Sequence, residues 1–163
     1  MIMCAKCQSL RDDTVLTPAA ANTDKDNNNP PSRLLVVDDD PDTARVLALS
    51  LCKHGFLVDA FSNPQDALQE IKSNPESYSL VLSDSMMPEL SGIQLAQKVK
   101  EINPGVKILL LTGSDIIDSV ASDMSPSTTA IDGFVQKPIG ITKLTAKILG
   151  LLDETKGRTF FKY

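Results

Sequence analysis

Residues 34–40 read Leu34-Leu35-Val36-Val37-Asp38-Asp39-Asp40, and this stretch decides the fold. Four apolar residues in a row are typical of a β-strand that is buried on both faces, as in a parallel sheet covered by helices. Asp40 is suited to cap a helix and Pro41 to occupy its first turn. Apolar residues then follow at helical spacing, at Ala44, Leu47, Ala48 and Leu51. The stretch therefore predicts a buried strand that leads directly into a helix.

The same alternation of strand and helix repeats along the chain. Further short apolar runs predict strands at residues 57–61, 80–82, 106–111 and 134–135. Helices are predicted after Asn63-Pro64, after Ser91 and from Ile141 to Leu152. A further helix is predicted after the fourth strand, from Ile116, Ile117 and Val120, and Pro126 must shorten that helix. The pattern predicts an α/β domain over residues 33–152, with five parallel strands in a doubly wound sheet and helices on both faces.

The predicted strands carry polar residues where they end. Three aspartates follow the first strand, Asp84 ends the third, Thr112 ends the fourth, and Lys137-Pro138 follows the fifth. The carboxyl ends of parallel strands meet at one edge of a sheet, where such folds place their chemistry. Clustered carboxylates need a compensating cation, and oxygen ligands with room for water suit Mg²⁺. This edge is therefore predicted to be a phosphoryl-transfer site with an aspartate as the nucleophile.

Composition and charge exclude several classes of function. The chain has 163 residues, a formal net charge of −5 and 42% hydrophobic residues. The acidic balance argues against direct nucleic-acid binding, which needs clustered Lys and Arg. The longest apolar runs fall far short of the ~20 residues of a membrane-spanning helix, and the N-terminus lacks the pattern of a secretion signal. We therefore expect a soluble, cytoplasmic protein that does not bind membranes.

Both flanks of the predicted domain have the character of tails. Residues 22–32 are polar apart from two prolines, so residues 1–32 are predicted to be a disordered polar tail and residues 153–163 a short C-terminal tail. Cys4 and Cys7 have the spacing of half a zinc site, but the chain's only histidine, His54, lies far from them. We interpret the two cysteines as incidental thiols and leave a zinc site as the alternative.

Four motifs at the strand ends resemble those of one family. They are Leu34–Asp40 as quoted above, Leu82-Ser83-Asp84-Ser85-Met86-Met87-Pro88-Glu89-Leu90-Ser91-Gly92, Leu110-Leu111-Thr112-Gly113, and Phe134-Val135-Gln136-Lys137-Pro138. Together they resemble the receiver domain of two-component response regulators, and the resemblance covers all of residues 33–152. It implies a flavodoxin-like strand order of 2-1-3-4-5. It also implies signalling by phosphorylation of an aspartate.

The resemblance assigns roles to individual residues. It implies that Asp84 is the phosphoacceptor and that the Mg²⁺ ligands are Asp38, Asp39, Asp84 and the backbone carbonyl of Met86. It also implies that Thr112 provides the switch hydroxyl and Phe134 the switch aromatic ring. Lys137 corresponds to the family's lysine, which precedes a cis proline, here Pro138. Packing alone would also explain an aromatic residue at Phe134. The sequence departs from the family pattern at Gly113, at Ser85 and at Pro126.

The leading hypothesis is a stand-alone phosphoacceptor that is not a metabolic enzyme. It would receive a phosphoryl group from a sensor histidine kinase or a phosphotransfer protein, with Mg²⁺ as cofactor. Few residues follow the last predicted helix, so we expect an unknown downstream protein rather than DNA to receive the signal. One alternative is a haloacid dehalogenase-type phosphatase, whose Asp-x-Asp motif residues 38–40 imitate, although this leaves Asp84 without a role. The other is a degenerate receiver that acts only as a docking module.

Overall fold

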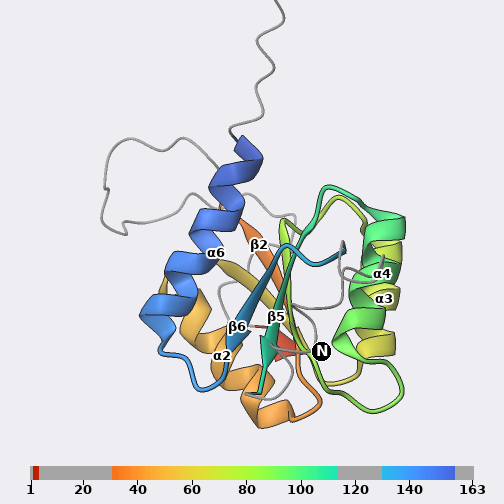
Figure 1. Cartoon of the computed structure of the whole chain (residues 1–163), viewed down its shortest axis with the longest axis horizontal. Helices are drawn as coiled ribbons and strands as arrows, with labels where there is room; N and C mark the ends of the chain where they lie inside the picture. The colour runs from red at the N-terminus through yellow and green to blue at the C-terminus, as the bar shows by residue number, and fades with distance from the viewer. Residues whose placement is uncertain (1, 4–30, 114–129, 157–163) are drawn as a thin grey trace, which may run out of the picture.

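A computed structural model describes residues 2–3, 31–113 and 130–156 of the chain. Strands and helices alternate through this part of the molecule (Figure 1). The strands are β1 (Ile2–Met3), β2 (Arg33–Val37), β3 (Leu57–Phe61), β4 (Leu80–Asp84), β5 (Lys107–Thr112) and β6 (Gly133–Gln136). The helices are α2 (Pro41–Lys53), α3 (Pro64–Ser73), α4 (Gly92–Ile102) and α6 (Ile141–Lys156).

Five parallel strands form the body of the sheet. Their spatial order is β3-β2-β4-β5-β6, which is the order 2-1-3-4-5 that the resemblance implied. The helices α2 and α6 cover one face, and α3 and α4 cover the other (Figure 1). The predicted fold class, a doubly wound parallel α/β sheet, is therefore confirmed.

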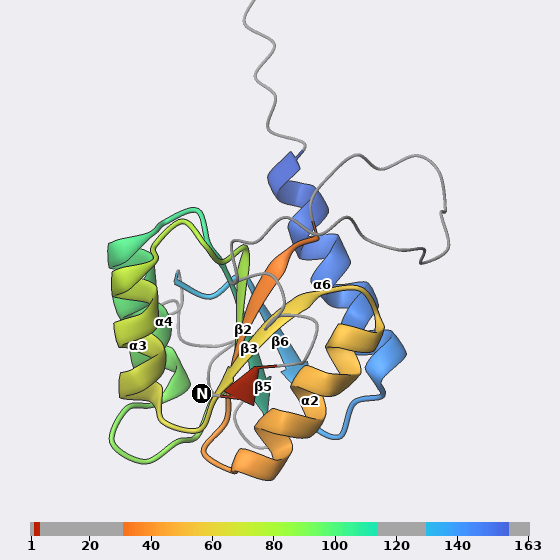
Figure 2. The ribbon, with the colours of Figure 1, turned by 180° about the vertical axis from the view of Figure 1, so that it is seen from behind.

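The sheet has a sixth strand that the sequence did not predict. Ile2 pairs with Ala60 and Met3 with Asp59, so that β1 runs antiparallel along the outer edge of β3 (Figure 2). These two residues belong to the segment that we predicted to be a disordered tail, and that prediction is wrong for them. Pairing with β1 satisfies backbone groups that the outer edge of a sheet otherwise leaves open.

Several other sequence predictions concern the ends of elements. The helix α6 continues to Lys156, beyond the boundary predicted at Leu152. The predicted helix near Ile116, the Cys4–Cys7 pair and the end of the C-terminal tail lie outside the described residues. No helix within the described residues is long and apolar enough to cross a bilayer.

Local signals explain how the helices start. The Asp40 side chain accepts a hydrogen bond from the backbone N–H of Asp42 and caps α2, with Pro41 in its first turn. Ser91 and Gln94 form a reciprocal capping box at the start of α4. Both caps stand just beyond the carboxyl ends of strands, so they fix the backbone that surrounds this edge of the sheet.

Two apolar clusters fill the space between the sheet and its helices. Alternate residues of each strand point to opposite faces, so Leu34 and Val36 pack beneath α2 and α6 whereas Leu35 and Val37 pack beneath α3 and α4. Burial on both faces accounts for the continuous apolar strands of the sequence. It also makes the sheet a rigid support for the side chains at its carboxyl edge.

Candidate functional site

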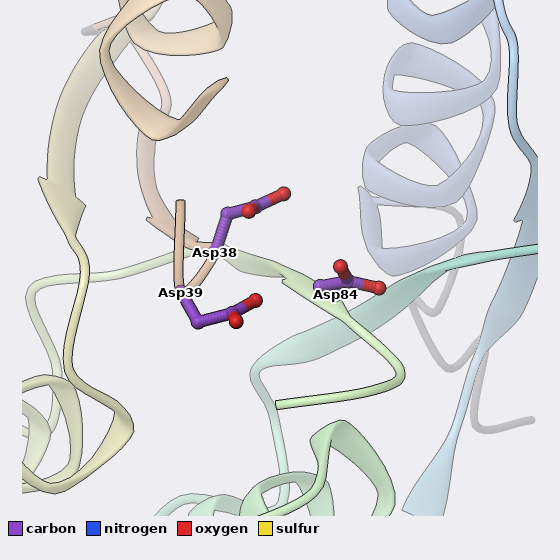
Figure 3. A group of neighbouring side chains, drawn as sticks. All are labelled: Asp38, Asp39 and Asp84. Carbon is purple, nitrogen blue, oxygen red and sulfur yellow. The ribbon is translucent and has the colours of Figure 1, made fainter. Parts of the chain in front are cut away.

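Three carboxylates meet at the carboxyl edge of the sheet. Asp38 and Asp39 directly follow β2, and Asp84 is the last residue of the neighbouring strand β4 (Figure 3). Each contributes a carboxylate oxygen to a group whose members all lie within 4.8 Å of one another. The side chain of Asp38 is buried, that of Asp84 is partly buried, and that of Asp39 is exposed. The site is therefore open to solvent on the side of Asp39.

A single ammonium group binds two of these carboxylates. Lys137 Nζ lies 2.9 Å from Asp84 Oδ2 and 3.3 Å from Asp38 Oδ2. The backbone N–H of Lys137 also donates to the carbonyl of Thr112 at 2.8 Å, which ties the segment after β6 to β5. The peptide bond between Lys137 and Pro138 is cis, as the resemblance implied.

The pKa values at the site reflect an excess of carboxylates over ammonium groups. Burial raises the pKa of Asp38, and the charge of Asp84 adds to that effect, although the Asp40 backbone N–H and Lys137 oppose it. Burial alone would lower the pKa of Lys137, but its bonds to Asp84 and Asp38 outweigh burial and raise it. Lys137 therefore stays protonated at neutral pH, and its one positive charge binds two of the three clustered carboxylates.

The two predicted switch residues lie on the face of the sheet that α3 and α4 cover. Thr112 is fully buried, and its hydroxyl donates to the carbonyl of Gly113 at 3.1 Å rather than to the carboxylates. Phe134 is partly buried against the cluster beneath α3 and α4. Lys147 on α6 donates to the backbone carbonyl of Phe134 at 2.6 Å. The structure thus clusters Asp38, Asp39 and Asp84 and pairs two of them with Lys137, whereas Thr112 is bonded to Gly113 and Phe134 packs against the α3 and α4 side.

Two further residues shape the site. The backbone N–H of Met86 lies 3.4 Å from Asp84 Oδ1, and the Met86 side chain is 67% exposed. Gly92, the first residue of α4, donates its N–H to Ser85 at 3.1 Å. A Cβ atom at Gly92 would collide with the carbonyl oxygen of Asp84, so α4 can begin this close to the site only with glycine there. Gly92 stands in a quoted motif, but a sequence pattern alone does not reveal how closely α4 approaches Asp84.

Asp40 does not join the carboxylates. Its side chain accepts from the Asp42 N–H at 3.1 Å and from the Thr43 hydroxyl at 2.6 Å. The phosphatase alternative needs the first and third aspartates of the run at one site, whereas Asp40 is engaged in capping α2. The carboxylate that lies close to Asp38 from another strand is therefore Asp84, and the Asp40 side chain is used for capping α2.

The donor atoms at this edge fit a magnesium ion. All three side chains offer carboxylate oxygen, one of them from a solvent-exposed position. Mg²⁺ favours one or two carboxylates while it keeps several waters, and an open, oxygen-only site meets both demands. The excess of negative charge over the single Lys137 favours a divalent cation further.

The fold and this site define a doubly wound α/β protein with an acidic, lysine-paired pocket at its carboxyl edge. The sequence matches the family model described as the response regulator receiver domain over residues 34–149. The chain belongs to this family. Its members are signalling phosphoacceptor domains of two-component systems, and Mg²⁺ binding at an acidic pocket is a feature of the family.

Individual relatives agree with this assignment. The chain is 41% identical over 74 residues to the response regulator receiver protein CpdR of Brucella abortus, covering 45% of this chain and 60% of that one. It is 28% identical over 116 residues to the probable transcriptional regulatory protein TcrX of Mycobacterium tuberculosis, covering 71% and 47% of the two chains. The chain thus spans between about half and three-fifths of the length of these curated relatives.

Solved structures match the fold more completely. A receiver domain protein from Clostridium thermocellum superposes with a TM-score of 0.70 and 25% identity, over 77% of this chain and 97% of that one. The response regulator TrrA from Thermotoga maritima, solved in complex with Mg²⁺ and BeF, superposes with a TM-score of 0.63 and 32% identity over 74% and 98%.

Proposed function

We propose that Asp84 accepts a phosphoryl group from a sensor histidine kinase or a phosphotransfer protein. The observation that carries this proposal is the cluster of three carboxylates at the carboxyl edge of the sheet, two of which, Asp38 and Asp84, bind the ammonium group of Lys137. Three features of Asp84 support its role as the nucleophile. It binds Lys137, it is partly exposed, and Asp38 and Asp39 reach it from the neighbouring strand.

Asp38, Asp39, Asp84 and the backbone carbonyl of Met86 would hold Mg²⁺. The bound ion would neutralise the charge of the carboxylates and of the incoming phosphoryl oxygens. Asp38 and Asp39 need no rearrangement of β2 for this task, because their oxygens already lie within 4.8 Å of that of Asp84. Asp39 is the more accessible ligand, since Asp38 is buried and also accepts from the backbone N–H of Asp40 at 3.1 Å.

The reaction forms one bond and breaks another. A carboxylate oxygen of Asp84 attacks phosphorus, and the bond between phosphorus and the donor's histidine nitrogen breaks, with the electron pair remaining on that nitrogen. Lys137 would turn from the carboxylate to the new phosphoryl oxygens, which carry more charge. Thr112 would donate its hydroxyl to the same oxygens in exchange for its bond to Gly113.

The signal would leave the site through Thr112 and Phe134. Movement of Thr112 toward Asp84 would vacate space on the face that carries Phe134, and Phe134 would repack there. An output protein would read this change at the surface, in the cytoplasm and without direct contact to nucleic acid. The domain would act as a signalling module whose only catalysis is its own phosphorylation and dephosphorylation.

Intact-mass spectrometry after incubation with acetyl phosphate tests the proposal. With Mg²⁺ present the protein should gain one phosphoryl group, and EDTA should prevent the gain. Asp84→Asn should abolish labelling, whereas Asp66→Asn, which alters an exposed aspartate of α3, should leave it intact. Labelling that persists in Asp84→Asn at another aspartate would contradict the assignment. A wild-type protein that is never labelled would instead support the docking-module alternative.

A further inference from the structure

Three buried hydroxyl groups lie next to the phosphoacceptor, at the carboxyl ends of β4 and β5. They belong to Ser83, Ser85 and Thr112, whose exposed fractions are 1%, 3% and 0%. Ser83 and Ser85 flank Asp84 in the sequence, so strand alternation directs both toward the face opposite to that of Asp84. Only Thr112 has a role in the proposed reaction. The two serines are unexplained.

The pairing of the strands places Ser85 beside Thr112. Asp84 pairs with Leu111, and the backbone N–H of Ser85 donates to the Leu111 carbonyl at 2.9 Å, which is the last bond of the ladder between β4 and β5. Ser85 is the first residue after β4 and Thr112 the last residue of β5, so each stands one position beyond the Asp84–Leu111 pair, with its side chain directed to the same face. Side chains at such positions are close enough to interact directly.

The three hydroxyls differ in their hydrogen bonds. Ser83 Oγ donates to the carbonyl of Asp84 at 2.9 Å, and Thr112 Oγ1 donates to the carbonyl of Gly113 at 3.1 Å. Ser85 Oγ is buried and has no hydrogen-bond partner in the described part of the chain. A buried hydroxyl without a partner destabilises the state that contains it. The described state is therefore the one in which the Ser85 hydroxyl is unsatisfied.

The start of α4 keeps Ser85 in this position. Gly92 donates to the Ser85 carbonyl and approaches the backbone of Asp84 and Ser85 too closely for any side chain at residue 92. The Ser85 backbone is thus held from both sides, by Leu111 of β5 and by Gly92 of α4. Its hydroxyl can gain a partner only if a neighbour moves, and the neighbour that the proposed function moves is Thr112.

We propose that Ser85 is a positioning residue that acts through Thr112. When Thr112 turns its O–H toward the phosphoryl group on Asp84, the Ser85 O–H donates to Thr112 Oγ1, so that one chain of hydrogen bonds runs from Ser85 through Thr112 to the phosphoryl oxygen. The inference rests on the proposed function. It adds that the unsatisfied hydroxyl of the described state becomes satisfied in the phosphorylated state, which favours the latter.

Binding of beryllofluoride, which stands in for the phosphoryl group, tests this role. Calorimetric titration in the presence of Mg²⁺ should show about fivefold weaker binding for Ser85→Ala than for wild type, the cost of one neutral hydrogen bond. In a Thr112→Ala background, Ser85→Ala should cause no further weakening, because the chain is already broken. An equal loss in both backgrounds, or no loss in either, would overturn the inference.

Stability of the protein without metal or beryllofluoride gives a second readout. Ser85→Ala should unfold at no lower denaturant concentration than wild type, because its hydroxyl is unpaired in that state. Ser83→Ala is the matched control. It removes a paired hydroxyl two residues away and from the same face, so it should lower the unfolding midpoint yet leave beryllofluoride affinity within twofold of wild type. Ser85→Ala lowering the midpoint as Ser83→Ala does would contradict the proposal. Wild-type protein that binds no beryllofluoride would overturn the proposed function itself.

Discussion

The two edges of the sheet carry charged clusters of opposite balance. The carboxyl-edge cluster consists of Asp38, Asp39, Asp84 and Lys137, so three carboxylates stand beside one ammonium group, which binds two of them. The amino-edge cluster consists of Lys100, Lys107 and Asp132, so two ammonium groups share one carboxylate. Both clusters join neighbouring strands of the sheet. The amino edge, where positive charge exceeds negative charge around one carboxylate, stabilises the fold. The carboxyl edge, where negative charge is in excess, is available for chemistry.

Every oxygen of the amino-edge carboxylate has a partner. Lys100 Nζ lies 2.8 Å from Asp132 Oδ2, Lys107 Nζ lies 3.2 Å from Asp132 Oδ1, and the backbone N–H of Ile108 donates to Oδ2 at 2.8 Å. Lys100 also donates to the carbonyl of Val106 at 2.7 Å. The cluster therefore ties the end of α4 to the first residues of β5 and to the residue before β6.

The ionisation of Asp38, which is buried, and of Asp132, which is partly buried, reflects this contrast. Burial raises the pKa of Asp38 above its ordinary value. Burial would do the same for Asp132, but hydrogen bonds from Lys100 and from the Ile108 N–H outweigh it and lower the pKa. The ionised form of Asp132 thus stabilises the folded protein, whereas the ionised form of Asp38 destabilises it. The carboxyl edge keeps unmatched negative charge that a cation can neutralise.

The largest expected effect is at the amino edge. Asp132→Ala should lower the free energy of unfolding by about 2–3 kcal/mol, because it leaves two lysines and the Ile108 N–H without their shared acceptor. Urea denaturation measures the change. Glu101→Ala alters an exposed carboxylate on the same helix as Lys100 and should stay within about 0.5 kcal/mol of wild type. Equal changes in the free energy of unfolding for Asp132→Ala and Glu101→Ala would contradict a stabilising role of the amino-edge cluster.

Magnesium should stabilise the protein through the carboxyl edge alone. At a concentration of ten times its Kd, Mg²⁺ should raise the free energy of unfolding by about 1.4 kcal/mol. Asp38→Asn should lose most of this increment because it removes a ligand, and Asp132→Ala should keep it despite its lower starting stability. Thermal unfolding with Mg²⁺ and with EDTA measures both. An increment that survives in Asp38→Asn would place the metal elsewhere.

In the absence of metal, Asp38→Asn should increase the stability of the protein instead of reducing it. Asp38→Asn should raise the free energy of unfolding by about 1 kcal/mol in EDTA, because an uncharged amide avoids the cost of a buried carboxylate near Asp84. Asp39→Asn is the control, since Asp39 is exposed and gains less from losing its charge. A loss of stability in Asp38→Asn would mean that the bond to Lys137 outweighs the cost of burial.

The carboxyl edge could be predicted from the sequence because its signals are local. Each strand contains a continuous apolar run, and each of these functional residues stands at or just after the end of a strand, so a parallel sheet alone brings Asp38, Asp84 and Lys137 together. The caps at Asp40 and Ser91 are equally local. Periodicity and capping therefore sufficed for the order of elements and for most of the carboxylate site.

The amino edge could not be predicted in this way. Lys100, Lys107 and Asp132 lie in separate elements, and each alone has the pattern of an ordinary surface charge. Two residues, Ile2 and Met3, carry too little pattern to indicate a strand, and β1 depends on the open edge of β3. The state of the Ser85 hydroxyl depends on how closely α4 approaches the backbone, which is a property of tertiary packing.

The smallest expected effect is on the pH dependence of stability. A carboxylate whose pKa is lower in the folded than in the unfolded protein stabilises the fold above its unfolded pKa, about 4, and this contribution is lost as pH falls through the folded pKa. The lowered pKa of Asp132 places it in this class. The difference in free energy of unfolding between wild type and Asp132→Ala should therefore be constant from pH 7 to about pH 5 and shrink by about 1 kcal/mol as pH falls below about 4. Urea denaturation at each pH measures it, with Glu101→Ala as the control. A difference that persists unchanged at the lowest pH at which the protein folds would show that Asp132 stabilises the amino edge through uncharged contacts, and the contrast between the two edges would then not be one of charge.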